Sequence, residues 1–193
     1  MNNLIILIFQ AADTGIDKDL STIIVGIFLV VATLAASNLV DRTGRKILLL
    51  ISVIVMTITL TALGVFFYIR DNNPDQARDI GWLPITSLCI YIFAFALGFG
   101  PVPWLMLSEV LSKEINPVIS PICGAFKWGL AFLITLTFSS ISEAIGIGQT
   151  FWIFAGISLV GVFFTFFVIP ETKGKSLAEI QRMLSGEKQI DQD

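Results

Sequence analysis

The feature that most constrains this chain is a pair of long apolar runs separated by only six residues. Residues 21–40 and residues 47–69 contain no charged side chain. Each run is long enough to cross a bilayer as a helix, which takes about 20 residues. Between them lies the charged turn Asp41-Arg42-Thr43-Gly44-Arg45-Lys46. Two spans joined by so short a turn are expected to be neighbouring antiparallel helices in a membrane.

The composition of the whole chain is also that of an integral membrane protein. Its 193 residues are 55% hydrophobic and 14% charged, with a mean hydropathy of +0.85, whereas a soluble domain carries about 25% charged residues. A net charge of −3 argues against nucleic acid as a partner. Histidine is absent, and Cys89 and Cys123 lie in apolar runs without metal-ligand spacing. We therefore expect an all-α integral membrane protein that is not an enzyme and uses no cofactor or metal.

Five spanning runs can be drawn along the sequence, at about residues 20–40, 47–69, 82–107, 117–141 and 149–169. The polar breaks between them are short, so successive helices should pack as antiparallel neighbours. A further apolar stretch at residues 4–12 is too short to span. We expect a span remnant and extracellular loop over 1–19, a five-span unit over 20–170, and a tail with a short amphipathic helix over 171–193.

Basic residues orient these spans, because cytoplasmic loops carry an excess of Lys and Arg. One side of the predicted bundle has eight of them: Arg42, Arg45, Lys46, Lys113, Lys173, Lys175, Arg182 and Lys188. The other side has three: Lys18, Arg70 and Arg78. We therefore expect the C-terminal tail to lie in the cytoplasm.

The third run contains a segment that disfavours a continuous helix, Gly98-Phe99-Gly100-Pro101-Val102-Pro103-Trp104. Each proline removes a backbone donor and disfavours helical geometry in the residue before it. Broken helices of this kind build transporter binding sites. Gly100 permits a close approach to the backbone, and Trp104 offers a flat face and an N–H donor that suit a sugar ring. A proline kink with an interfacial tryptophan explains the same residues equally well.

Lys127 is the only full charge in the interior of a spanning run. A charge at the centre of a span costs about 2.5–3.5 kcal/mol on insertion scales, so Lys127 should face the bundle interior or snorkel to the interface. One interpretation is a cavity-lining cation which, beside Trp128, contacts substrate or a carboxylate on another helix. The alternative is a snorkelled or locally hydrated lysine.

Two carboxylates are predicted to lie on the same membrane face as the charged turn. Glu109 and Glu171 each end a span on the side rich in basic residues, where another span ends in Asp41, Arg42, Arg45 and Lys46. A network joining three helix ends would hold them together, since even exposed pairs contribute about 0.2–1 kcal/mol each. That is the scale needed to bias a two-state gate. The basic residues also set topology and can bind anionic lipid headgroups.

Together these segments resemble the C-terminal half of a sugar porter of the major facilitator superfamily. The resemblance rests on the charged turn, on the segment 98–104 with Ser108-Glu109 beyond it, and on Pro170-Glu171-Thr172-Lys173-Gly174-Lys175-Ser176-Leu177. It covers nearly the whole chain, from residue 8 onward. The proline-containing segment is most similar to that of insect facilitated trehalose transporters.

The resemblance implies the C-terminal half of a twelve-helix bundle, here with five full spans and a partial one. It implies a carrier, expected in the plasma membrane, that holds trehalose or a hexose between two six-helix halves and works by alternating access without ATP. Gly100 and Trp104 match sugar-proximal positions of the family. Four residues match a cytoplasmic charge network that closes the inner gate: Asp41, Arg45, Glu109 and Glu171.

The chain departs from the family pattern at several places. Lys127 stands where the family commonly has a sugar-binding asparagine, Asn116 where it usually has an arginine, and Ser112 where it usually has a proline. The glutamine-rich segment of the family's seventh helix is absent from the sequence.

We expect the chain to be a truncated piece of a longer carrier, inactive alone, whose partners are the bilayer and a missing N-terminal half. The alternatives are a genuine five-span protein, a non-transporting half that associates with or regulates a full-length carrier, or a carrier for another solute.

Overall fold

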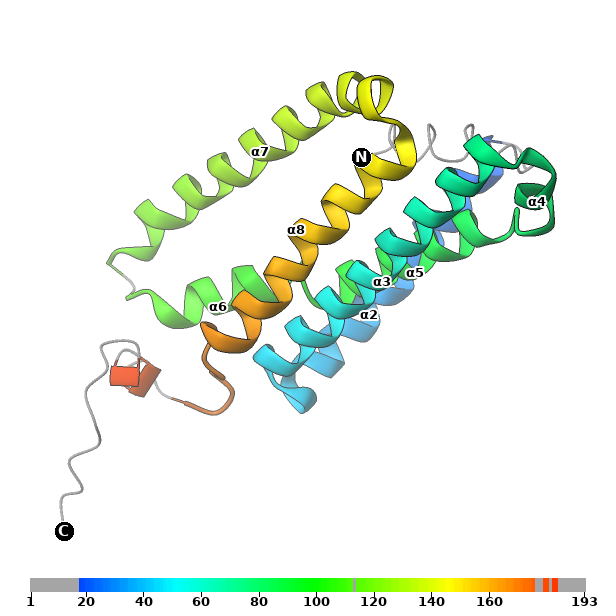
Figure 1. Cartoon of the computed structure of the whole chain (residues 1–193). Helices are drawn as coiled ribbons and strands as arrows, with labels where there is room; N and C mark the ends of the chain where they lie inside the picture. The colour runs from blue at the N-terminus through cyan, green and yellow to red at the C-terminus, as the bar shows by residue number, and fades with distance from the viewer. Residues whose placement is uncertain (1–17, 113, 176–178, 181, 184–193) are drawn as a thin grey trace, which may run out of the picture.

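A computed structural model describes residues 18–112, 114–175, 179–180 and 182–183 of the chain. Helices make up its secondary structure there (Figure 1): α2 (Lys18–Thr43), α3 (Arg45–Asn72), α4 (Pro74–Asp79), α5 (Leu83–Leu97), α6 (Val102–Val110), α7 (Asn116–Ile145) and α8 (Ile147–Phe167). The predicted span remnant at 1–19 and most of the predicted tail helix lie outside the described residues.

Four helical stretches are long and apolar enough to cross a membrane: α3, α5 together with α6, α7 and α8. The first predicted run falls within α2, which has 26 residues. The third predicted run, 82–107, is divided into α5 and α6 by residues 98–101, as the two prolines and two glycines favour. The short α4 was not predicted; it follows Asn73 and has Pro74 in its first turn, where a missing N–H is harmless.

α3 is the central helix and packs against both α5 and α8. Two glycines make the α3–α8 crossing close. A β-carbon added to Gly64 would lie 2.3 Å from Cδ1 of Trp152 and 3.0 Å from the carbonyl oxygen of Gly148. One added to Gly148 would in turn lie 2.9 Å from the carbonyl oxygen of Gly64. Small residues at both positions let the two backbones approach, which is the usual way helices pack in membranes.

An aromatic cluster fills the space beside this crossing. Phe67 of α3 and Phe151 of α8 stack with their ring centroids 5.4 Å apart, and both side chains are almost completely buried. Leu88 and Ile92 of α5 belong to the same buried cluster. The three helices α3, α5 and α8 therefore form one packed unit, with α2 against α5.

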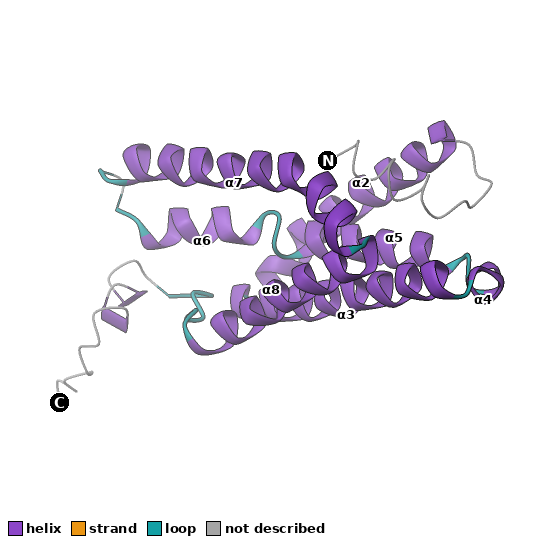
Figure 2. Ribbon diagram, turned by 45° about the horizontal axis from the view of Figure 1, so that its top comes forward, coloured by secondary structure: helices purple, strands orange, loops and turns teal. Residues whose placement is uncertain are grey.

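α7 stands apart from this unit. Figures 1 and 2 both show it set apart from α3 and α5, with α6 beside its first half. Phe138 is its one buried residue within the described structure, and its ring lies 6.1 Å from that of Phe151 and 6.3 Å from that of Phe154 on α8. One long apolar helix thus makes little contact with the rest of the described chain.

Candidate functional site

The charged end of the bundle brings together the start of α3, the end of α6 and the segment that follows α8 (Figure 1). Arg45, the first residue of α3, donates hydrogen bonds to Oε1 of Glu109 from Nε at 3.1 Å and from Nη2 at 2.9 Å. These side chains are 14% and 24% exposed, so water screens the ion pair only in part. Two residues predicted to share this membrane face are therefore in direct contact.

Glu171 contacts α3 through the backbone. Its carboxylate oxygens accept hydrogen bonds from the amides of Arg45 at 3.0 Å and Lys46 at 3.1 Å. These amides belong to the first turn of α3, where backbone donors have no partner within the helix. Gly44 is the N-cap residue of α3, and Glu171 caps its first-turn amides from a segment far away in the sequence, where its negative charge suits the positive end of the helix dipole.

Gly44 makes this capping contact possible. Its φ of +96° is a conformation that side-chain-bearing residues rarely adopt, and a β-carbon there would lie 2.7 Å from Oε2 of Glu171. The positive φ therefore favours glycine at this position, and a side chain here would push the Glu171 carboxylate away from its contact with α3.

Sequence reasoning missed the part played by Thr172. Its hydroxyl is buried and donates a hydrogen bond of 2.7 Å to Oε2 of Glu109, so both oxygens of that carboxylate are occupied. A neutral hydroxyl gives no charge signal, but its position directly after Glu171 was available as a clue. We call Gly44, Arg45, Glu109, Glu171 and Thr172 the charged-end cluster.

Hydrogen bonding sets the electrostatics of Glu171. Partial burial acts to raise the pKa of its carboxyl group. Hydrogen bonds from the backbone amides of Lys173, Arg45, Lys46 and Thr172 outweigh that effect and hold the pKa below its ordinary value. The carboxylate is therefore stabilised in its charged form at neutral pH.

The remaining residues of the charged turn lie at the edge of this cluster. Arg42 is exposed, and its carbonyl oxygen accepts a hydrogen bond of 2.6 Å from Nζ of Lys173. Nζ of Lys46 lies 5.8 Å from the ring centroid of Phe166 on α8. The side chain of Asp41 lies outside the described part of the structure.

The break between α5 and α6 is packed against α3. The amide of Gly100 bonds to the carbonyl of Phe95 at 2.7 Å, a wider turn than that of an α-helix. The amide of Phe99 donates instead to Oγ of Ser52 at 3.2 Å, and that hydroxyl donates to the carbonyl of Ala94 at 2.7 Å. Ser52, which sequence reasoning missed, thus satisfies backbone groups at the break.

Gly98, rather than Gly100, is the point where another helix comes closest. A β-carbon at Gly98 would lie 2.4 Å from Cβ of Ser52 and 2.8 Å from the carbonyl oxygen of Leu48. A β-carbon at Gly100 would lie 3.1 Å from the carbonyl oxygen of Phe95, within its own segment. The break therefore depends on glycine for its packing on α3.

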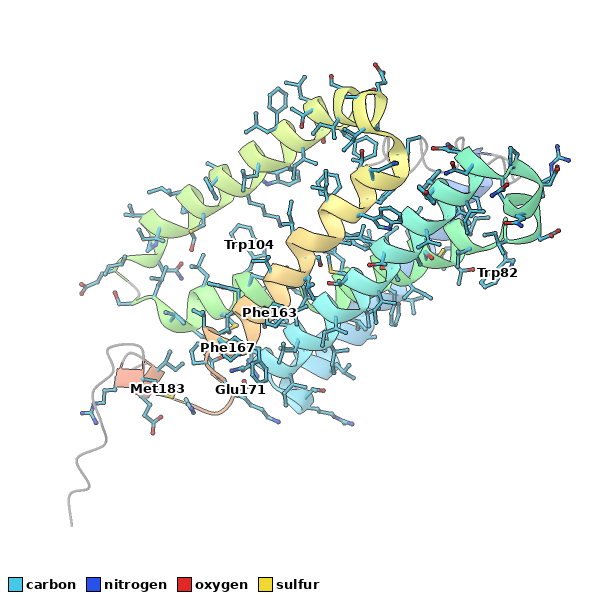
Figure 3. All side chains as sticks on the ribbon, in the orientation of Figure 1. Trp82, Trp104, Phe163, Phe167, Glu171 and Met183 are labelled. Carbon is cyan, nitrogen blue, oxygen red and sulfur yellow. The ribbon has the colours of Figure 1, made fainter. Side chains whose placement is uncertain are left out.

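Trp104 lies on the part of α6 that faces α7, as Figure 3 shows. Its side chain is 38% exposed. Nζ of Lys127 on α7 lies 5.1 Å from the centroid of the Trp104 ring. A β-carbon at Gly124, one turn before Lys127, would lie 3.6 Å from Cη2 of the same indole.

Trp128, the other predicted substrate residue, is 72% exposed. The structure therefore brings Trp104 and Lys127 together from two helices and leaves Trp128 on the open surface of α7. Among the described residues no group of three or more His, Cys, Asp and Glu side chains could hold a metal ion.

Comparison with known proteins defines the family. Residues 8–184 match the family described as "Sugar (and other) transporter". The facilitated trehalose transporter Tret1 of Aedes aegypti is 46% identical over 179 residues, which is 93% of this chain and 22% of that relative. Facilitated trehalose transporter Tret1 of Bombyx mori is 43% identical over 184 residues, covering 95% of this chain and 36% of that relative. The chain thus spans well under half the length of these relatives.

Solved structures give the same result. The inward open conformation of the xylose transporter XylE from E. coli superposes with a TM-score of 0.74 at 28% identity, over 94% of this chain and 41% of that one. The proton:xylose symporter XylE bound to 6-bromo-6-deoxy-D-glucose gives 0.74 at 32% identity, over 86% and 35%. The fold is therefore that of a membrane transporter of the major facilitator superfamily, which confirms the predicted all-α class. More particularly, the chain belongs to the sugar transporter family.

Proposed function

We propose that this chain is the C-terminal part of a carrier that moves trehalose or a hexose across the plasma membrane by alternating access. Family membership and the insect trehalose transporters at about 46% identity support a sugar as the solute. In the described spans no carboxylate lies away from a helix end, which favours facilitated diffusion over proton coupling.

The broken helix formed by α5 and α6 is the observation that carries this proposal. A helix break at membrane depth leaves polar backbone exposed unless protein covers it. Here Ser52 and the glycines hold the break, and Trp104 follows it with an indole that is partly exposed. The ring can stack on the C–H face of a sugar while its N–H donates one hydrogen bond.

The charged-end cluster supports a gating role in the same carrier. Alternating access requires one end of the bundle to hold two arrangements whose free energies differ by a few kcal/mol. The Arg45–Glu109 pair and the Glu171 cap tie three helix ends together through hydrogen bonds that relative movement of those ends would break. We infer that this end faces the cytoplasm, because eight of the basic residues fall on that side.

We also infer that transport needs more than this chain. Almost all of α7 is exposed within the described structure, so this apolar helix has room for a protein partner on one side as well as lipid on the other. The proposed partner is the N-terminal half of the carrier. The second candidate function, a non-transporting half that associates with a full-length carrier, rests on the same exposed helix.

The test is transport by a chimera in which residues 8–184 replace the matching segment of the Bombyx mori trehalose transporter. We expect saturable uptake of trehalose or glucose in proteoliposomes, and none from the 193-residue chain alone. Trp104→Ala should lower uptake by at least about tenfold, the effect of losing one well-placed stacking contact. Trp82→Ala, at the other end of the molecule (Figure 3), is the matched control and should leave uptake unchanged.

Three results would each contradict a part of the proposal. A chimera that reaches the membrane but moves neither sugar would overturn the carrier function. Equal uptake by the Trp104→Ala and Trp82→Ala chimeras would remove Trp104 from the sugar path. Saturable uptake by the isolated chain would overturn the inferred need for a second half.

A further inference from the structure

Lys127 is the one charged side chain that the described spans hold away from their ends. The other charged residues of the spanning helices lie near a helix end: Lys18, Asp19, Asp41, Arg42, Arg45, Lys46, Arg70, Asp71, Glu109 and Glu143. Lys127 lies about 16 Å along α7 from its first residue, at a rise of about 1.5 Å per residue. A cation at this depth needs an electrostatic partner.

The partner that the structure gives Lys127 is an aromatic face. Its Nζ lies 5.1 Å from the centroid of the Trp104 ring, within the range of a cation–π contact. Gly124 borders the far edge of the same ring, so the indole lies along α7 with the ammonium over it. No ion pair of Lys127 with a carboxylate occurs among the described side chains. The quadrupole of the ring attracts the ammonium but does not neutralise its charge.

A ring and an uncompensated cation together define a particular ligand chemistry. The free part of the indole can stack on the C–H face of a sugar. The ammonium carries three donors and no acceptor, so it favours a ligand oxygen that carries negative charge. Such a charge-assisted hydrogen bond is about twice as strong as a neutral one, and low local dielectric strengthens it further.

We propose that Lys127 is a specificity-determining residue that makes the Trp104 site prefer saccharides bearing an anionic group over neutral saccharides of the same shape. This inference rests on the proposed function, because it takes Trp104 as the place where a sugar stacks. The anionic group is a carboxylate or a phosphate, which share the same chemistry toward an ammonium.

The test compares glucose with glucuronate, in which a carboxylate replaces the terminal hydroxymethyl group. Binding to the full 193-residue chain in nanodiscs is followed by tryptophan fluorescence, with Trp104→Phe to identify the signal. We expect glucuronate to bind about tenfold more tightly than glucose, the ratio that separates charged from neutral hydrogen bonds. Glucose 6-phosphate forms a second arm and distinguishes phosphate from carboxylate as the preferred anion.

Lys127→Gln removes the charge and keeps a polar side chain of similar length. This variant should bind glucuronate and glucose with about the same affinity. The matched control is Arg78→Gln, which removes an exposed cation on α4 and should keep the preference. Equal affinities for the two sugars in the unaltered chain, or no binding of either, would overturn the inference. So would the same preference in the unaltered and Lys127→Gln chains.

Failure of the proposed function and failure of this inference would give different combinations of results in the transport and binding assays. A chimera that moves no sugar, combined with glucuronate preference in nanodiscs, would overturn the carrier function and keep the role of Lys127. Uptake of neutral sugar by the chimera, with no glucuronate preference in the binding assay, would support the carrier function and overturn the role of Lys127.

Discussion

The two ends of the short helix α6 handle charge in opposite ways. Near its C-terminal end, Glu109 has both carboxylate oxygens occupied, one by the Arg45 guanidinium and one by the Thr172 hydroxyl. Near its start, Trp104 meets the Lys127 ammonium, which has an aromatic face for a partner and no carboxylate within the described structure. The first region is a closed set of matched groups. The second is open toward a ligand or another helix.

On the roles proposed above, the first region stabilises the fold and the second binds a ligand. Matched groups at partial burial stabilise one arrangement of helix ends, since separating them leaves charges with fewer hydrogen bonds. A cation with an incomplete set of partners contributes little to folding and remains available for a ligand. The two regions should therefore respond in opposite ways to removal of a charge or a hydrogen bond.

The largest effect should come from Ser52, because it holds the break that positions all of α6 and so supports both regions. Ser52→Ala leaves the amide of Phe99 without its side-chain acceptor and should lower the free energy of unfolding by about 1–3 kcal/mol. Unfolding in mixed micelles measures this. Thr61→Ala is the control, because its exposed hydroxyl bonds within its own helix. Equal losses of unfolding free energy in the two variants would show that the hydrogen bonds of Ser52 do not stabilise the break between α5 and α6.

A smaller effect, confined to the charged-end cluster, is expected from Glu171. Glu171→Gln should lower the free energy of unfolding at pH 7 by about 1 kcal/mol, the scale of a helix cap and its dipole interaction. Because the folded pKa of Glu171 is lowered, its contribution is present above the unfolded pKa and is lost as pH falls through the folded pKa. Unfolding measured from about pH 6 to about pH 3 should therefore depend on pH more steeply in the unaltered chain than in Glu171→Gln.

Glu143→Gln provides the control for that pH series, since Glu143 is exposed at the end of α7. It should retain the steep dependence. If the free energy of unfolding of Glu171→Gln depended on pH as it does in the unaltered chain, Glu171 would not stabilise the charged-end cluster through its charge.

The smallest effect on stability should come from Lys127. Lys127→Met gives up a cation–π contact worth about 0.5–1 kcal/mol and removes a charge that is costly within a span. The free energy of unfolding should therefore stay constant or rise. A loss above about 1 kcal/mol would mean that Lys127 is a structural residue like those of the charged-end cluster.

Sequence reasoning found the charged residues of both regions but only part of what holds them. The alternation of the predicted spans placed Arg45 and Glu109 on one face, and the structure brings them together because the start of α3 and the end of α6 lie at the same end of the bundle. It did not find Thr172 or Ser52, because a hydroxyl carries no charge and leaves the hydrophobic pattern unchanged. It named Glu171 without the backbone contact, which depends on the left-handed conformation of Gly44.

The helices themselves were predictable from the lengths of the apolar runs, and the break in the third run from its prolines. The separation of α7 from the other helices could not be predicted from the sequence. Its sequence is as apolar as that of its neighbours, and periodicity cannot tell a lipid-facing side from one that awaits another helix.

Matched charges in the charged-end cluster join α3 to α6. A double-mutant cycle of Arg45→Gln and Glu109→Gln, measured on the free energy of unfolding in mixed micelles, tests this claim most directly. We predict that the double variant loses less than the sum of the two single losses, with a coupling free energy of about 1–3 kcal/mol. Losses that add to within about 0.3–0.5 kcal/mol would contradict the claim.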